Sequence, residues 1–85
     1  MNIDISDRAK KQLKRLPAAI KKKTYKSFSL LASNYRHPSL RSRKMAGQPH
    51  YEARIDYHYR FIFAVQEDII KILVVGPHDE GLGKK

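Results

Sequence analysis

The second half of the chain contains three successive segments with the patterns of β-strands, and this feature restricts the fold more than any other. Apolar residues occupy every second position in the first two segments, at Tyr51, Ala53, Ile55 and Tyr57 and then at Phe61, Phe63 and Val65. Residues 69–75 are almost continuously apolar, which is typical of a buried strand. Three such strands with short connections predict an antiparallel meander.

The pairing of these strands follows from the requirement that their apolar residues share one face. A connection at residues 57–59 pairs Ala53 with Phe63, and a tight turn at Glu67–Asp68 continues the same face into the last strand. The other face then carries the charged residues, which are Glu52, Arg54, Asp56 and Arg60.

This pairing also predicts what meets at one end of the sheet. Arg60 lies across from Val75, and the chain that leaves the last strand carries His78 past the same end, near Asp56. The sequence therefore predicts that an arginine, a carboxylate and a histidine come together there.

The first half predicts a short strand and two helices. Ile3 and Ile5 alternate with polar residues, as in a strand. Ser6 and Asp7 form a helix start, so that a helix is expected from Asp7 to Leu16, where Pro17 ends it. A second helix buries a stripe at Ile20, Thr24, Phe28 and Leu31, with Tyr35 one turn further on.

Helices that precede a meander predict an α+β fold in the order β-α-α-β-β-β, with two N-terminal helices packed on a small antiparallel sheet. Residues 34–49 form the connection, in which residues 44–47 are a candidate short strand. The whole chain, residues 1–85, is expected to be a single domain, with residues 79–85 as a frayed tail.

Charge is distributed unevenly along the chain. The net charge is +10, but residues 1–50 contain 13 basic and 2 acidic side chains, whereas residues 51–85 contain 5 and 6. Asp7 is the single carboxylate between residues 5 and 51, so the lysines lack acidic partners. A solvated helix face is one explanation, and a surface for nucleic acid is the other. The candidate nucleic-acid-binding residues are Lys10, Lys11, Lys14, Lys22, Lys23, Lys26, Arg41, Arg43 and Lys44.

Composition excludes several classes of protein. No apolar run approaches the ~18 residues of a transmembrane helix, and the first residues lack the pattern of a secretory signal. The absence of cysteine excludes disulfides and thiolate catalysis. Histidines and carboxylates are too scattered for a metal site, and no glycine-rich loop is present to hold a nucleotide phosphate. We therefore expect a cytoplasmic protein without a metal or a small-molecule cofactor.

The predicted cluster suits the chemistry of a phosphodiester. Guanidinium groups bind phosphate in its ground and pentacovalent states, and imidazole exchanges protons near neutral pH. Arg54, Arg60 and His78 are therefore candidate catalytic residues for RNA cleavage. In the alternative interpretation, Arg54 or Arg60 forms an ordinary cross-strand ion pair with Asp56 on a wet sheet face.

Four tyrosines leave a similar choice open. A tyrosine in a strand or near a turn either stacks on a nucleobase or packs at the rim of the core. The residues concerned are Tyr35, Tyr51, Tyr57 and Tyr59.

The ordered set of motifs resembles the RelE/ParE superfamily of bacterial type II toxin–antitoxin toxins, from the first strand to Asp79. The motifs are Lys14-Arg15-Leu16-Pro17, His37-Pro38-Ser39-Leu40, Lys44-Met45-Ala46-Gly47, Tyr51-Glu52-Ala53-Arg54-Ile55, Tyr59-Arg60-Phe61-Ile62-Phe63 and Ile72-Leu73-Val74-Val75-Gly76-Pro77-His78-Asp79. The resemblance implies two N-terminal helices on an antiparallel sheet and neutralisation by a cognate antitoxin. In the RelE-like branch it also implies mRNA cleavage in the ribosomal A site.

The resemblance assigns roles to individual residues. Arg54 would polarise the nucleophile or the phosphate, Arg60 would hold the transition-state charge, and His78 would donate a proton to the leaving oxygen. Glu52 stands where some ribosome-dependent members have a lysine, and it acts either as a general base or as an ion-pair partner of Arg54. Our pairing places Glu52 about 13 Å along the strand from the row of Arg60, at ~3.3 Å per residue.

The sequence thus predicts a ribosome-dependent mRNA endoribonuclease that inhibits translation, with a cognate antitoxin, the ribosome and mRNA as partners. The C-terminal tyrosine of some members has no counterpart, which leaves an altered mechanism open. The alternatives are a ParE-like inhibitor of DNA gyrase without nuclease activity and a basic nucleic-acid-binding module without toxicity.

Overall fold

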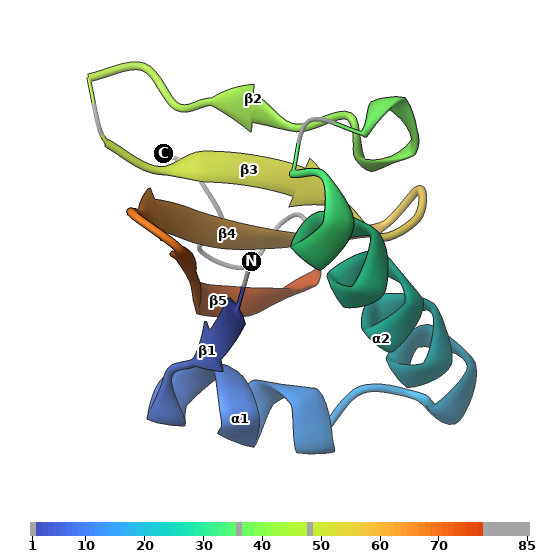
Figure 1. Ribbon diagram of the computed structural model, residues 1–85. Helices are drawn as coiled ribbons and strands as arrows, with labels where there is room; N and C mark the ends of the chain where they lie inside the picture. Colours follow the sequence, from blue (N-terminus) through green and yellow to red (C-terminus); the bar gives the residue numbers. More distant parts are fainter. Residues whose placement is uncertain (1, 36, 48, 78–85) are drawn as a thin grey trace.

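Two helices cover one face of a five-stranded sheet in the computed structural model (Figure 1), which describes residues 2–35, 37–47 and 49–77. In chain order the elements are β1 (Asn2–Ile5), α1 (Asp7–Lys14), α2 (Ala18–Ser33), the 3₁₀ helix η1 (Pro38–Leu40), β2 (Arg43–Lys44), β3 (Tyr51–Arg54), β4 (Tyr59–Gln66) and β5 (Ile69–Pro77). The strands lie in the order β1-β5-β4-β3-β2. The pairs are antiparallel except β1–β5, which is parallel.

This architecture confirms the predicted α+β class with two N-terminal helices. The predicted short first strand is also confirmed, and it lies at one edge of the sheet. The candidate strand at residues 44–47 is present only as the two-residue strand β2, which begins one residue earlier. Residues 79–85, the expected tail, lie outside the described residues.

Local hydrogen bonds determine where α1 begins and ends. The Oγ atom of Ser6 accepts the N–H of Ala9 at 3.0 Å, which is the predicted N-cap of α1. The helix ends at Lys14, two residues before the predicted end, because the next two N–H groups bond to carbonyls three residues back. Leu16 still reaches the core, and Pro17 stands directly before α2.

The core lies between the helices and the sheet. The rings of Phe28 on α2 and Phe61 on β4 meet edge to face at 5.2 Å between centroids. Tyr35, Tyr51 and Tyr59 pack against this core, so three of the four tyrosines have a structural role. The buried apolar residues of the core are Ala9, Leu13, Leu16, Phe28, Leu31, Leu40, Ala53, Phe61, Phe63, Ile70, Ile72 and Val75.

The pairing of β3 with β4 differs from the prediction by two residues. Ala53 lies opposite Phe61, whereas the prediction placed it opposite Phe63. The chain turns earlier because Oδ1 of Asp56 accepts the N–H of Tyr59 at 3.1 Å, and Tyr59 is already part of β4. A shift of two residues leaves every strand side chain on its face, so the apolar face and the position of Glu52, Arg54 and Arg60 on the other face are as predicted. Asp56, predicted on that charged face, lies instead in the turn and pairs with Lys23 on α2.

The pairing of β4 with β5 is as predicted near their connecting turn and shifts further along. The ladder skips Leu73, which forms a bulge. Arg60 therefore lies opposite Gly76 and not, as predicted, opposite Val75.

The segment around the start of α1 binds the backbone at the bulge. The Oγ atom of Ser6 donates to the carbonyl of Leu73 at 3.0 Å, and Oε1 of Gln12 accepts the N–H of Val75 at 2.8 Å. Two backbone groups near the irregularity thus have partners from the N-terminal part of the chain. In the described part of the chain, no helix is long and apolar enough to cross a membrane.

Candidate functional site

Arg54 and Arg60 lie directly opposite each other on β3 and β4. Their neighbours Ala53 and Phe61 point into the core, so the two arginine side chains leave the sheet on the face opposite the helices. The Nε atoms of both arginines are buried and lack a hydrogen-bond partner within the described residues. Two like charges directly opposite each other are unfavourable. An arrangement of this kind is suited to binding an anion.

Glu52 lies on the same face, two residues before Arg54. The residue is only 6% exposed, and its Oε1 atom lies 3.6 Å from Nη1 of Arg60 and 3.5 Å from Nε of Arg43. The predicted separation of about 13 Å between Glu52 and the row of Arg60 is therefore wrong, because the two-residue shift brings them together. The ion-pair partners of Glu52 are Arg60 and Arg43 rather than Arg54.

The ion pair with Arg60 differs from the one with Arg43 in its exposure to solvent. The Arg60 side chain is 16% exposed, whereas that of Arg43 is 78% exposed. Screening by water makes an exposed pair weak, while a buried charge is costly without its partner. Glu52 thus restrains mainly the guanidinium of Arg60.

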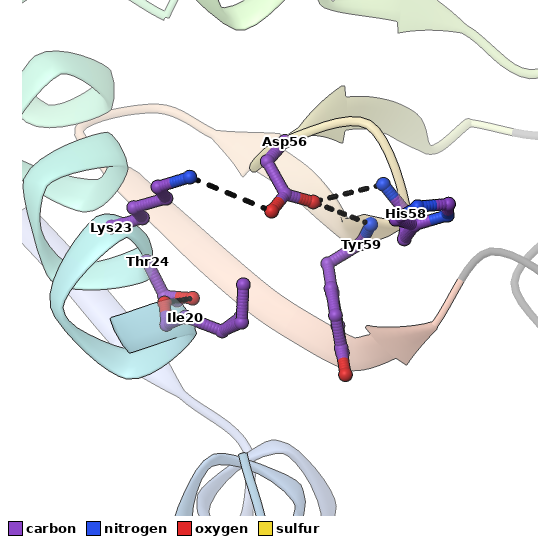
Figure 2. A network of polar contacts seen from close by, with 6 residues as sticks. All are labelled: Ile20, Lys23, Thr24, Asp56, His58 and Tyr59. Carbon is purple, nitrogen blue, oxygen red and sulfur yellow. Dashed lines mark hydrogen bonds and ion pairs between the residues drawn. The ribbon is translucent and has the colours of Figure 1, made fainter. Parts of the chain in front are cut away.

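Asp56 does not belong to this cluster. Its Oδ1 atom accepts the N–H groups of His58 and Tyr59 at 2.9 and 3.1 Å, and its Oδ2 atom lies 3.7 Å from Nζ of Lys23 on α2 (Figure 2). The alternative in which Asp56 pairs with Arg54 or Arg60 is therefore wrong. The carboxylate beside the arginines is that of Glu52.

His78, the third candidate catalytic residue, lies outside the described residues. The structure therefore brings together Arg54, Arg60 and Glu52, and it adds Arg43. Among residues 2–35, 37–47 and 49–77, no three His, Cys, Asp or Glu side chains form a group that could hold a metal ion.

The predicted basic surface is exposed on both helices and near β2. Its residues are Lys10, Lys11 and Lys14 on α1, Lys22, Lys23 and Lys26 on α2, and Arg41, Arg43 and Lys44. Lys23 and Arg43 have the carboxylate partners described above. A hollow of about 340 Å³ between the helices has apolar walls at Leu13 and Tyr25 and a rim of lysines. The basic surface therefore contains a groove.

Sequence reasoning missed two connections. Arg43 reaches Glu52 because β2 pairs with β3, and a two-residue strand has no periodicity to reveal it. The turn at Asp56 had a usable signal, because an aspartate at the start of a turn often accepts backbone N–H groups two or three residues further on.

Comparison with solved structures defines the class of the fold. The chain is similar to RelE in the RelE–RelB complex of Pyrococcus horikoshii OT3, with a TM-score of 0.79, 24% identity and coverage of 94% of this chain and 97% of that one. The Escherichia coli RelBE complex gives a TM-score of 0.77 at 19% identity, covering 93% and 98%. The YoeB–YefM complex of Staphylococcus aureus gives 0.71 at 22% identity, covering 92% and 97%. The fold is thus that of toxins from type II toxin–antitoxin systems.

Residues 3–82 match the family described as ParE toxin of type II toxin-antitoxin system, parDE. The chain belongs to this family, and it is therefore a toxin of a type II toxin–antitoxin system, as the resemblance to the RelE/ParE superfamily predicted. No curated protein sequence gave a match.

Proposed function

We propose that this toxin is a ribosome-dependent endoribonuclease that cleaves mRNA and so inhibits translation. The observation that carries the proposal is the pair of facing arginines, Arg54 and Arg60, whose buried Nε atoms lack partners within the described residues. Donors that are fixed before reaction and aimed at developing negative charge are the principal means of stabilising such a transition state. A guanidinium pair suits the extra charge of a pentacovalent phosphorus.

In the proposed reaction, the 2′-hydroxyl oxygen bonds to the adjacent phosphorus while the bond to the 5′-oxygen breaks. One proton leaves the 2′-hydroxyl and one proton is delivered to the 5′-oxygen, which yields a cyclic phosphate and a 5′-hydroxyl. Arg54 and Arg60 stabilise the phosphorane, and His78 is the proposed proton donor. The role of His78 rests on the family resemblance.

We assign Glu52 a positioning role rather than that of the general base. Its carboxylate is buried and already engaged by Arg60 and Arg43, at 3.6 and 3.5 Å. A carboxylate in that position restricts Arg60 to one orientation, and preorganisation of this kind supports catalysis.

The proposed partners are the ribosome, mRNA and a cognate antitoxin. The net charge of +10 and the exposed lysines favour a polyanion, and the similar RelE and YoeB chains were solved as complexes with RelB and YefM. A cognate antitoxin with acidic segments would compete for the same surfaces.

Translation in a purified ribosome system, with primer extension on the message, tests the proposal. Arg60→Ala should lower the rate of A-site cleavage about 10²- to 10³-fold, because it removes a charged donor from the transition state. Arg60→Lys keeps the charge and loses the planar fork, so it should recover only part of the rate. The matched control is Lys71→Ala, a basic residue on β5 opposite Ala64, which should cleave at the wild-type rate.

A second candidate function is inhibition of DNA gyrase, which the family description as a ParE toxin favours. An intact message together with blocked supercoiling would support this candidate and contradict the nuclease. If neither translation nor DNA topology changes, both candidate functions are contradicted.

The salt dependence of RNA binding tests whether the lysines of α2 contact phosphates. For single strands the logarithm of the binding constant falls with the logarithm of salt concentration by about 0.7 per phosphate contact. Lys22→Ala and Lys26→Ala should each reduce that slope by about this amount in titrations of short RNA. Lys23→Ala should reduce it less, because Lys23 is paired with Asp56. An unchanged slope in the Lys22 and Lys26 variants would mean that these lysines are solvated and do not contact RNA.

A further inference from the structure

Tyr57 differs from the other tyrosines of the strand region because its side chain faces solvent. It is 80% exposed, the largest exposed fraction among the large hydrophobic residues of the described chain, whereas Tyr51 and Tyr59 pack on the core. Its ring meets that of His58, also exposed, at 5.0 Å between centroids and 82° between planes. The tip of the β3–β4 turn thus presents two aromatic rings that the core does not use.

Hydrogen bonds restrain the backbone of the turn that carries these rings. Oδ1 of Asp56 accepts two backbone N–H groups, and Oδ2 of Asp56 lies near Lys23 (Figure 2). The carbonyl of Tyr59 accepts the N–H groups of Ile55 and Asp56 at 2.9 and 3.3 Å. The turn is tied both to its own backbone and to α2. A ligand that binds its tip therefore loses less free energy to ordering of the backbone than it would on an unrestrained loop.

The turn also connects the two arginines of the site. Arg54 is the last residue of β3 and Arg60 is the second of β4, so the chain between them contains only the turn and Tyr59. At ~3.3 Å per residue, Tyr57 is within roughly 10 Å of either arginine along the chain. This upper limit puts the turn within the reach of a nucleotide next to a phosphate held by the arginines.

We propose that Tyr57, supported by His58, is a stacking site for an unpaired nucleobase adjacent to the phosphate bound at Arg54 and Arg60. This inference rests on the proposed function, since it names how the substrate RNA is held. Every base has a π-face, so stacking on an aromatic side chain binds single-stranded RNA with little dependence on sequence. Asp56 is a positioning residue, because it fixes the turn without touching the base.

Tyr57→Trp provides a direct reporter, because the chain contains no other tryptophan. A short single-stranded RNA should quench its fluorescence, whereas a sugar-phosphate oligomer of the same length without bases should not. Tyr57→Ala should weaken RNA binding about tenfold, and Tyr57→Phe should keep wild-type affinity because it retains the ring. The control Ile69→Ala removes an exposed apolar side chain at the β4–β5 turn, and its affinity should equal that of the wild type.

Equal quenching by both oligomers, or wild-type RNA affinity in Tyr57→Ala, overturns the stacking site. A loss of antitoxin affinity in Tyr57→Ala at unchanged RNA affinity also overturns it and assigns the rings to a protein partner. Failure of the proposed function gives a different result, since the wild-type protein would then leave the message intact. Circular dichroism of each variant establishes that the fold is retained.

Discussion

The two faces of the sheet are built from neighbouring residues and do different work. On β4, Phe61 and Phe63 point to the helices and are fully buried, while Arg60 points to the opposite face. Because side chains alternate along a strand, one strand serves both faces. The core and the candidate site are therefore one residue apart in the sequence.

The two faces also differ in whether their buried polar groups have hydrogen-bond partners. On the helix side, the buried hydroxyl of Thr24 donates to the carbonyl of Ile20 at 2.7 Å. On the opposite face, the Nε atoms of Arg54 and Arg60 are buried without a partner in the described part of the chain. Unpaired buried donors cost stability, and under the proposed function a bound phosphate would supply the missing acceptor.

The largest expected effect is on the free energy of unfolding, and it compares two substitutions on β4, one on each face of the sheet. Phe61→Ala should lower the free energy of unfolding by about 3–5 kcal/mol, because it leaves a cavity against Phe28 and Phe63. Arg60→Ala should lower it less, by about 1–3 kcal/mol, because the buried Glu52 then keeps only the exposed Arg43 as a partner, and the proposed function predicts that most cleavage is lost. Urea denaturation of both variants measures this. If Arg60→Ala were the more destabilising, the division of labour between the faces would be refuted.

A smaller loss of stability is expected when Glu52, the carboxylate that pairs with Arg60, is replaced. Glu52→Gln should lower the free energy of unfolding by about 1–3 kcal/mol, because it leaves Arg60 beside Arg54 without its counter-charge. A double-mutant cycle measures the coupling free energy between Glu52 and each arginine. Coupling of Glu52 should be larger with Arg60 than with the exposed Arg43. Equal coupling to both would mean that burial does not distinguish the two ion pairs.

The smallest effect is expected at Ser6, which binds the backbone of β5 at the bulge. Ser6→Ala should lower the free energy of unfolding by about 1–2 kcal/mol, since it removes both the N-cap of α1 and the bond to Leu73. The matched control is Ser29→Ala on the exposed side of α2, which should be near neutral. Thermal unfolding compares the pair, and equal melting temperatures would show that the bulge needs no help from Ser6.

Much of the fold could be predicted because periodicity determines which side of each element is buried. The alternation around Ala53 and Phe61 placed Glu52, Arg54 and Arg60 on one face correctly, but not Asp56, which lies in the turn. The same alternation cannot distinguish registers that differ by two residues, since both put the same side chains on the same face. The hydrogen bonds of Asp56 decide between them, and they place Glu52 beside Arg60. The parallel partner of β1 and the bulge at Leu73 depend on contacts between distant segments, which no local pattern encodes.

The parallel pairing of β1 with β5 bears on how the toxin is made. Ser6 and Leu73 bond to each other across 67 positions, and α1 packs on β5. During synthesis the N-terminal strand and first helix emerge long before the strand on which they dock. The nascent chain therefore cannot complete its sheet until β5 has been synthesised, because both β1 and α1 dock on that strand.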